Sequence, residues 1–225
     1  MADARELLQK IRTGLKPLEE KILRHRYLEA LQTGRVAREK LRIFAGQQYH
    51  IITSDLRSIA LLLCRHGNLA SRPYILAILE GENAAFEALA KFAHTLEMSD
   101  EELSASEPIP AALAYSAFVA WLALYGSDAE LAAAFSVNLP AWGANCGRIS
   151  AALKAQYRLE AEAASFFDLF ANLPPGDDTA LAVIQGGLDR GVAPALIERA
   201  ARLLQGYELM YWDTMAEVAA LRGET

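Results

Sequence analysis

A carboxylate lies within the apolar face of the last long helical segment. This segment reads GYELMYWDTM from Gly206 to Met215, and its Glu208 stands among large apolar side chains. At about 100° per residue, Glu208 falls near the middle of the face that such a helix buries. A buried carboxylate must be protonated or hydrogen-bonded. Glu208 is therefore either a structural hydrogen-bonding group or a general acid/base or ligand anchor in an internal pocket.

Two other segments place polar side chains among apolar ones in the same way. In the segment from about 35 to 65, Gln48 and Asp55 share a helical face with aliphatic and aromatic residues. In the segment 141–171, Asn145 shares a face with aromatic residues. Each of these polar groups is expected to point toward the interior of a helical bundle.

Together, these groups predict a polar-lined cavity in the core. Tyr115 adds a phenol from an otherwise apolar segment, and bundle cores are where such folds build ligand sites. Aromatic side chains around the cavity would suit a ring-shaped ligand. The candidate catalytic residue is Glu208, and the candidate ligand-binding residues are Tyr115, Gln48, Asn145, Trp212 and Asp55.

The elements that must position these residues are helices. The hydrophobic residues are mainly Ala and Leu, and no alternating strand pattern is present, so the sequence predicts one all-α domain over residues 1–225. The segment 109–125 is apolar on all sides and is expected at the centre of the bundle. Lys16-Pro17 and Thr33-Gly34 should end the first two helices, and the later helices should cover residues 35–65, 71–80, 83–97, 109–125, 128–137, 141–171, 178–189 and 194–221.

Composition and charge restrict the partners. The net charge is −6, and basic residues gather in the first third, but they are interleaved with acids and no nucleic-acid motif follows. The most apolar run, 111–125, is too short to cross a bilayer. Two cysteines and the lack of a signal-peptide pattern favour a reducing, cytoplasmic setting. We therefore expect neither a nucleic-acid partner nor a membrane partner.

Several motifs resemble those of one protein family. The stretch YELMYWDTM resembles the closing signature of the TenA family of thiamin-pyrimidine salvage hydrolases. FEALAKFAHTLEMSDEEL (86–103) is similar to the matching stretch of pyrroloquinoline-quinone synthase C. The resemblance runs from about Tyr27 to Ala219 and implies a haem-oxygenase-like helical bundle. Further TenA-like stretches, in the family's order, are AGQQYHI (45–51), ALAYSAFVAWLALYG (112–126) and NLPAWGANCGRI (138–149).

The chain departs from this family at positions that carry its chemistry. The family's nucleophile is the Cys of a Leu-Pro-Cys motif, and this position is Ala141 here. The Tyr four residues later is Asn145, and the pyrimidine-binding Asp is Gln48. Tyr115 and Glu208 keep the family's residue types, and Glu208 matches its acid/base glutamate. The resemblance thus implies chemistry at Glu208 without a Cys nucleophile.

These observations leave three functional alternatives. The chain is a divergent TenA-like protein that binds a small heterocyclic or aromatic molecule. It is then either a metal-independent enzyme of cofactor metabolism or a non-catalytic binding or regulatory protein. A non-haem iron oxygenase of the same fold needs several inward-facing His and carboxylate ligands, which the sequence does not place, so we predict no metal site and no cofactor. Family members usually form dimers or tetramers, so a homodimer is expected.

Overall fold

Helices form all the regular secondary structure in the part of the chain that the structure describes. The computed structural model describes residues 3–173 and 177–221. This confirms the predicted all-α class. The helices are α1 (Ala4–Leu23), α2 (Arg26–Gln32), α3 (Arg38–His66), α4 (Arg72–Thr95), α5 (Asp100–Ser104), α6 (Pro110–Tyr125), α7 (Asp128–Ala155), α8 (Ser165–Ala171), α9 (Asp177–Asp189) and α10 (Pro194–Val218).

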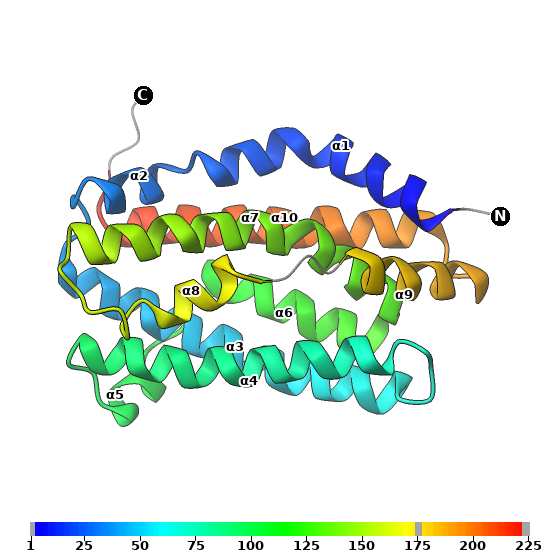
Figure 1. Cartoon of the computed structure of the whole chain (residues 1–225), viewed down its shortest axis with the longest axis horizontal. Coiled ribbons are helices and arrows are strands. Elements are labelled where there is room, and N and C mark those ends of the chain that lie inside the picture. The colour runs from blue at the N-terminus through cyan, green and yellow to red at the C-terminus, as the bar shows by residue number, and fades with distance from the viewer. Residues whose placement is uncertain (1–2, 174–176, 222–225) are drawn as a thin grey trace.

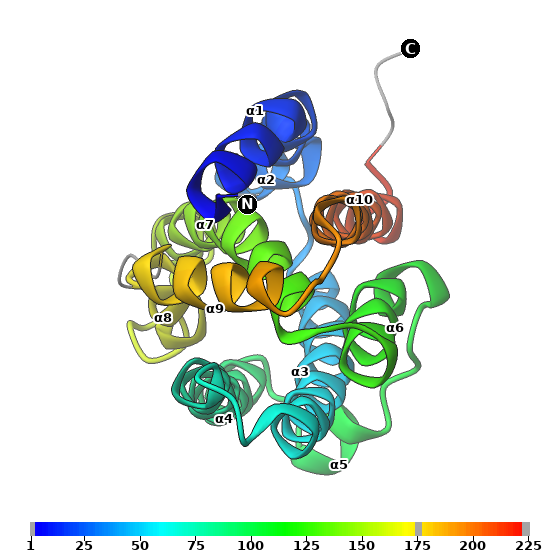
Figure 2. The ribbon, with the colours of Figure 1, turned by 90° about the vertical axis from the view of Figure 1, so that its right-hand side faces the viewer.

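The long helices lie side by side along one axis of the molecule (Figure 1). In the end-on view, α1 and α2 lie at one side, α4 and α5 at the opposite side, and α3, α7 and α10 between them (Figure 2). Helix α10 packs against α7, α6 and α1, and α3 packs against α6 and α4. None of the described helices is long and apolar enough to cross a membrane.

The main core is rich in aromatic rings. Trp212 is fully buried, and its ring lies 5.4 Å from that of Trp142 and 6.1 Å from that of Tyr27. Phe44 stacks on Tyr27 at 6.3 Å, which connects α3 to α2. Large rings bury much apolar surface and pack in offset or edge-on pairs, so this cluster anchors α10 against α2, α3 and α7.

Helix α7 differs from the prediction because it continues through Pro140. The sequence predicted separate helices at 128–137 and 141–171, but the structure has one helix from Asp128 to Ala155 and a short second helix, α8. A proline inside a helix leaves the carbonyl four residues earlier without its N–H donor. Arg12 on α1 donates from Nη2 to the Ser136 carbonyl at 3.1 Å, which satisfies this group. A tertiary contact therefore supports the helix at Pro140.

Two further predicted boundaries and one predicted position in the bundle were wrong. Helix α1 also passes through a proline, Pro17, and does not end there. Residues 71–80 and 83–97 belong to one helix, α4, which runs without a break. Helix α6 lies at the edge of the bundle (Figure 2), and Trp121 and Tyr125 are 41% and 68% exposed, so the apolar segment is not central. A uniformly apolar sequence could not reveal which of its sides faces solvent.

Gly143 brings α8 close to α7. A Cβ atom at this position would lie 2.8 Å from the backbone oxygen of Phe170, so a larger residue would push the two helices apart. The close approach places Phe170 beside Trp142, with ring centroids 5.8 Å apart. Both residues line the internal cavity described below.

Candidate functional site

A cavity of about 1020 Å³ lies inside the bundle. Helices α1, α3, α4, α6, α7, α8, α9 and α10 all contribute residues to its wall. Its volume is at the upper end of the roughly 300–1,000 Å³ typical of small-molecule sites. Aromatic side chains form much of the wall, including Phe135, Trp142, Phe170 and Tyr211. The cavity can therefore enclose a ligand of one or more rings.

Glu208 lies in this wall and is only 2% exposed. Trp212, one helical turn later on α10, donates its indole Nε1–H to Glu208 Oε1 at 3.0 Å. The Asn138 side-chain amide on α7 donates to the other oxygen, Oε2. Burial raises the pKa of Glu208 to about 8 and outweighs these two hydrogen bonds, which lower it. Glu208 therefore holds a proton at neutral pH inside a cavity that could contain a ligand.

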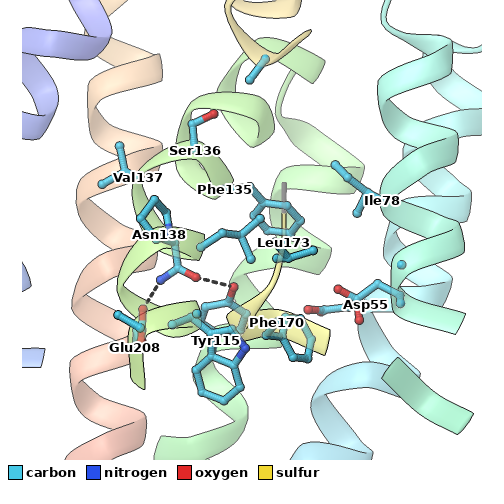
Figure 3. Close-up of a pocket in the computed structure, with 18 of the residues that line it drawn as sticks. Asp55, Ile78, Tyr115, Phe135, Ser136, Val137, Asn138, Phe170, Leu173 and Glu208 are labelled. Carbon is cyan, nitrogen blue, oxygen red and sulfur yellow. Dashed lines mark hydrogen bonds between the residues drawn. The ribbon is translucent and has the colours of Figure 1, made fainter. Parts of the chain in front are cut away.

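Asn138 connects Glu208 to Tyr115. The Tyr115 hydroxyl donates to Asn138 Oδ1 at 3.0 Å, and Asn138 Nδ2 also donates to Gln205 Oε1 at 3.0 Å. The amide lies between the carboxyl and the phenol (Figure 3). Tyr115, Asn138 and Glu208 all line the cavity, so α6, α7 and α10 together present one hydrogen-bonded polar surface to its interior.

Asp55 lies in another part of the wall, on the far side of Tyr115 from Glu208 (Figure 3). It is 3% exposed, and its Oδ1 has no hydrogen-bond partner among the described residues. Burial raises its pKa well above the ordinary value, and repulsion from Glu82 raises it further. Burial also raises the pKa of Glu82, to about 7. Asp55 on α3 and Glu82 on α4 thus form a second acidic region of the cavity.

A sequence profile of the TENA/THI-4/PQQC family matches residues 12–166, which is more than half of the chain. The chain belongs to the TENA/THI-4/PQQC family. The match confirms the resemblance that the sequence motifs indicated. A comparison with curated proteins gave no match.

Solved structures share the fold at low sequence identity. A TenA homologue from P. horikoshii OT3 is 16% identical, with a TM-score of 0.74 over 94% of this chain and 99% of that chain. A TenA homolog from Pseudomonas syringae pv. tomato is 12% identical, with a TM-score of 0.78 over 93% and 92%. Heme oxygenase-1 from the cyanobacterium Synechocystis, solved with heme, is 16% identical, with a TM-score of 0.67 over 94% and 91%. The predicted haem-oxygenase-like fold is therefore confirmed.

The structure brings four of the six predicted site residues to the cavity, namely Glu208, Tyr115, Gln48 and Asp55. Gln48 is 3% exposed and lies next to the Tyr211 hydroxyl, which has no hydrogen-bond partner of normal geometry in the described part of the chain. These side chains come from α3, α6 and α10, and the helical wheels had indicated an inward direction for those on α3 and α10. Whether they contact a ligand stays a prediction.

Asn145 and Trp212 are buried, but neither lines the cavity. The Asn145 amide points toward the end of α1 and donates to the Ile22 carbonyl at 3.4 Å. Trp212 supports the site from behind, through its hydrogen bond to Glu208 and its ring contacts with the wall residues Trp142 and Tyr211. A helical wheel shows which face is buried, but it cannot show which part of that face meets a packed neighbour and which part meets a cavity.

Ala141, which by resemblance occupies the position of the family's nucleophilic Cys, does not face the cavity. Ala141 is 1% exposed, belongs to the main hydrophobic core and does not line the cavity, although its neighbours Pro140 and Trp142 do. Covalent catalysis at this position would need a nucleophilic side chain that faces the cavity, and Ala141 provides neither the nucleophile nor the contact with the cavity.

Two cavity residues were missed by the sequence reasoning. Asn138 was expected just beyond the end of a helix at 137, and Glu82 was expected between two helices, so neither was assigned to a buried face. Both lie inside continuous helices, α7 and α4. If the helical pattern had been continued across the predicted breaks at 138–140 and 81–82, both residues could have been assigned to a helical face. In the described residues, no group of three or more His, Cys, Asp or Glu side chains could hold a metal ion.

Proposed function

We propose that this TenA-family chain binds a small heterocyclic or aromatic molecule in the cavity and acts on it by proton transfer at Glu208, as a metal-independent enzyme of cofactor metabolism. The observation that carries the proposal is the buried Glu208 carboxyl, held by Trp212 and Asn138 at the wall of a ring-lined cavity. A general acid works best when its pKa is close to the working pH. The pKa of Glu208, about 8, meets this condition.

The two N–H donors determine how Glu208 would act. Trp212 and Asn138 each donate to one carboxyl oxygen, which fixes the plane of the group. The acidic proton must then point along a remaining lone pair. A ligand ring packed against the Trp142–Phe170 pair, which forms part of the cavity wall, would lie in the same cavity as this proton. We infer that Glu208 donates a proton to a ring or leaving-group atom and recovers it from water or product.

A non-catalytic ligand-binding protein is the second candidate, and Ala141 favours it. Without the family's nucleophilic Cys, the cavity could bind the family's type of ligand without turning it over. The third alternative, an iron oxygenase, gains no support from the described residues, which lack a cluster of possible metal ligands.

Glu208→Gln separates the first two candidates. Mass spectrometry of molecules that co-purify, followed by a thermal-shift screen of pyrimidines, pterins and quinone precursors, would first identify a ligand. An enzyme should lose at least about a hundredfold in turnover on removal of a general acid while keeping its ligand affinity within a few fold. Glu217→Gln, on the exposed face of the same helix, is the control. Full turnover in the Glu208→Gln variant would refute the proposed role.

We also propose that two copies associate through the exposed aromatic side of α6. Trp121 stacks on Phe118 with ring centroids 5.8 Å apart and lies 5.9 Å from the ring of Tyr125, so a rigid apolar surface faces outward. A monomer rarely exposes a large apolar patch without a partner. Trp121→Glu should convert a dimer to a monomer in analytical ultracentrifugation. An unchanged sedimentation coefficient would contradict this interface.

The cysteines support a reducing, cytoplasmic location within the same proposal. Cys64 is an exposed free thiol, and Cys146 is a buried free thiol. Exposed unpaired thiols persist mainly where the environment keeps them reduced. Localisation of the tagged protein in the cells that produce it would test this part of the proposal.

A further inference from the structure

The Asp55–Glu82 region of the cavity has no assigned role in the proton transfer proposed at Glu208. It lies away from the Asn138–Glu208 network, on the other side of Tyr115 (Figure 3). Both carboxyl groups line the cavity, one from α3 and one from α4. Asp55 is 97% buried and still lacks a partner for Oδ1 among the described residues. A buried polar atom without a partner is unfavourable unless something else supplies the missing hydrogen bond.

The protein does not itself neutralise this pair. Both pKa values are raised by burial, and that of Asp55 is raised further by repulsion from Glu82. No Lys, Arg or His forms an ion pair with either group in the described part of the chain. In native structures, buried acidic groups are normally paired with cations or hydrogen-bond donors. The two carboxyl groups therefore face the cavity without a cationic partner on the protein.

Carboxyl groups outnumber basic groups among the other titratable residues of the wall. Arg12 on α1 lines the cavity and keeps its positive charge while it donates to the Ser136 carbonyl at 3.1 Å. The remaining acidic wall residues are Glu19 on α1 and Glu208 on α10, and the phenols are Tyr74, Tyr115 and Tyr211. Burial is the main cause that raises the pKa of the Tyr115 phenol, and repulsion from Asp55 and, to a smaller extent, Glu208 raises it further. Glu19, Asp55, Glu82 and Glu208 outnumber Arg12 in the wall, so ionisation of these carboxyl groups would favour a positively charged ligand.

We propose that Asp55 and Glu82 form a subsite for a positively charged ammonium or amidinium group of the ligand. This inference rests on the proposed function, because it requires a small molecule in the same cavity. Such a cation offers several N–H donors, one of which would satisfy Asp55 Oδ1, and its charge would offset the repulsion between the carboxylates. The rest of the ligand would extend past Tyr115 toward Asn138 and Glu208. The substrate class is thus a cationic amine or amidine attached to a ring.

An organic cation fits this subsite better than a metal ion. Hard divalent cations take six or more oxygen ligands in protein sites. Here two carboxyl groups are present without a third His, Cys, Asp or Glu that could complete a metal site in the described residues. The surrounding wall contains apolar side chains such as Ile78, Phe170 and Leu173 (Figure 3), which suit the carbon skeleton of an organic ligand.

Benzamidine and benzamide make a matched pair of probes, since they have similar shapes and only benzamidine is charged. Isothermal titration calorimetry on the full chain should show benzamidine binding about tenfold or more tightly than benzamide, as charge-assisted hydrogen bonds are stronger than neutral ones. Glu82→Gln and Asp55→Asn should each reduce this preference by about tenfold. Glu80→Gln, on an exposed part of the same helix, is the control and should leave it unchanged.

A second measurement uses the wild-type protein and does not depend on the folding of a variant. Below neutral pH the pair retains protons, so a bound cation should release about one proton as the carboxyls ionise. Titrations at about pH 6 in two buffers of different ionisation enthalpy would detect this release. Benzamide should release none.

The possible outcomes separate this inference from the proposed function. Equal binding of benzamidine and benzamide would overturn the cationic subsite and leave the cavity as a ligand site. Benzamidine binding that is insensitive to both Asp55→Asn and Glu82→Gln would also overturn it, as would saturable binding of Mg²⁺ or Mn²⁺ in place of the amidine. If neither probe binds, the cationic subsite is refuted, and the proposed function is tested separately by the ligand screen and the turnover of Glu208→Gln.

Discussion

The two acidic regions of the cavity differ in how the protein satisfies them, although Glu208 and Asp55 are both buried and Glu82 is half-buried. Glu208 receives one N–H donor on each oxygen, from Trp212 and Asn138. Asp55 has an oxygen without a partner among the described residues. Burial raises its pKa, and repulsion from Glu82 raises it further. Burial raises the pKa of all three carboxyls. The protein itself positions the first group, whereas the second becomes fully satisfied only with a ligand.

The largest expected effect concerns the pH dependence of folding stability. The pKa of Glu208 is raised from 4.5 to about 8, so the folded protein binds a proton that the unfolded chain releases. This contribution to stability is fully present below pH 4.5 and is lost as pH rises toward about 8. Glu208→Gln removes this titration, so the wild-type free energy of unfolding should fall relative to the variant by up to about 1.4 kcal/mol per pH unit in that range.

The difference between wild type and variant is the quantity to measure, by urea unfolding from about pH 5 to pH 8. His25 and His66 have lowered pKa values and act in the opposite direction, but they are common to both proteins and cancel. The titrations of Asp55 and Glu82 are likewise present in both proteins, so they do not affect the difference. A pH-independent difference would show that Glu208 is ionised in the folded state, which would contradict its role as a proton donor.

A smaller effect is expected when the Glu208 region is made to resemble the Asp55 region. Trp212→Phe keeps an aromatic ring but removes the donor to Glu208 Oε1, which leaves a buried oxygen without a partner. The free energy of unfolding should fall by about 1–3 kcal/mol. Trp121→Phe is the control, since Trp121 is 41% exposed on α6 and makes no hydrogen bond to Glu208. Equal losses in the two variants would show that ring volume, and not the N–H donor, determines the effect.

The smallest effect should be a gain in stability when the repulsion between Asp55 and Glu82 is removed. Glu82→Gln removes the repulsion between the two carboxyls, so the ligand-free protein should be stabilised by about 1 kcal/mol near pH 8 and little changed near pH 5. Glu80→Gln should change neither value by more than about 0.5 kcal/mol. Thermal unfolding at both pH values tests this. Destabilisation by Glu82→Gln at high pH would mean that Glu82 has a structural partner and that the pair is not held open for a ligand.

Sequence reasoning located the Glu208 region better than the Asp55 region. Glu208, Gln48 and Asp55 each interrupt an apolar stripe, and helical periodicity alone predicted that each faces inward. Tyr115 was added from a segment that is apolar on all sides. Asn138 and Glu82 complete the two regions, but both fell at predicted helix boundaries. Proline and glycine near these positions suggested breaks that the tertiary contacts prevent, as the Arg12 contact to the Ser136 carbonyl shows beside Pro140.

By itself, the sequence determined the helical class, the family and the inward direction of most polar groups in the cavity. These depend on residue type and on a repeat of 3.6 residues within single helices. Only the tertiary structure decided which buried groups meet. It joined Asn138 to Glu208, placed Glu82 beside Asp55 and turned Asn145 toward Ile22. Contacts between helices depend on axial register and packing distance, and no pattern within one helix contains that information.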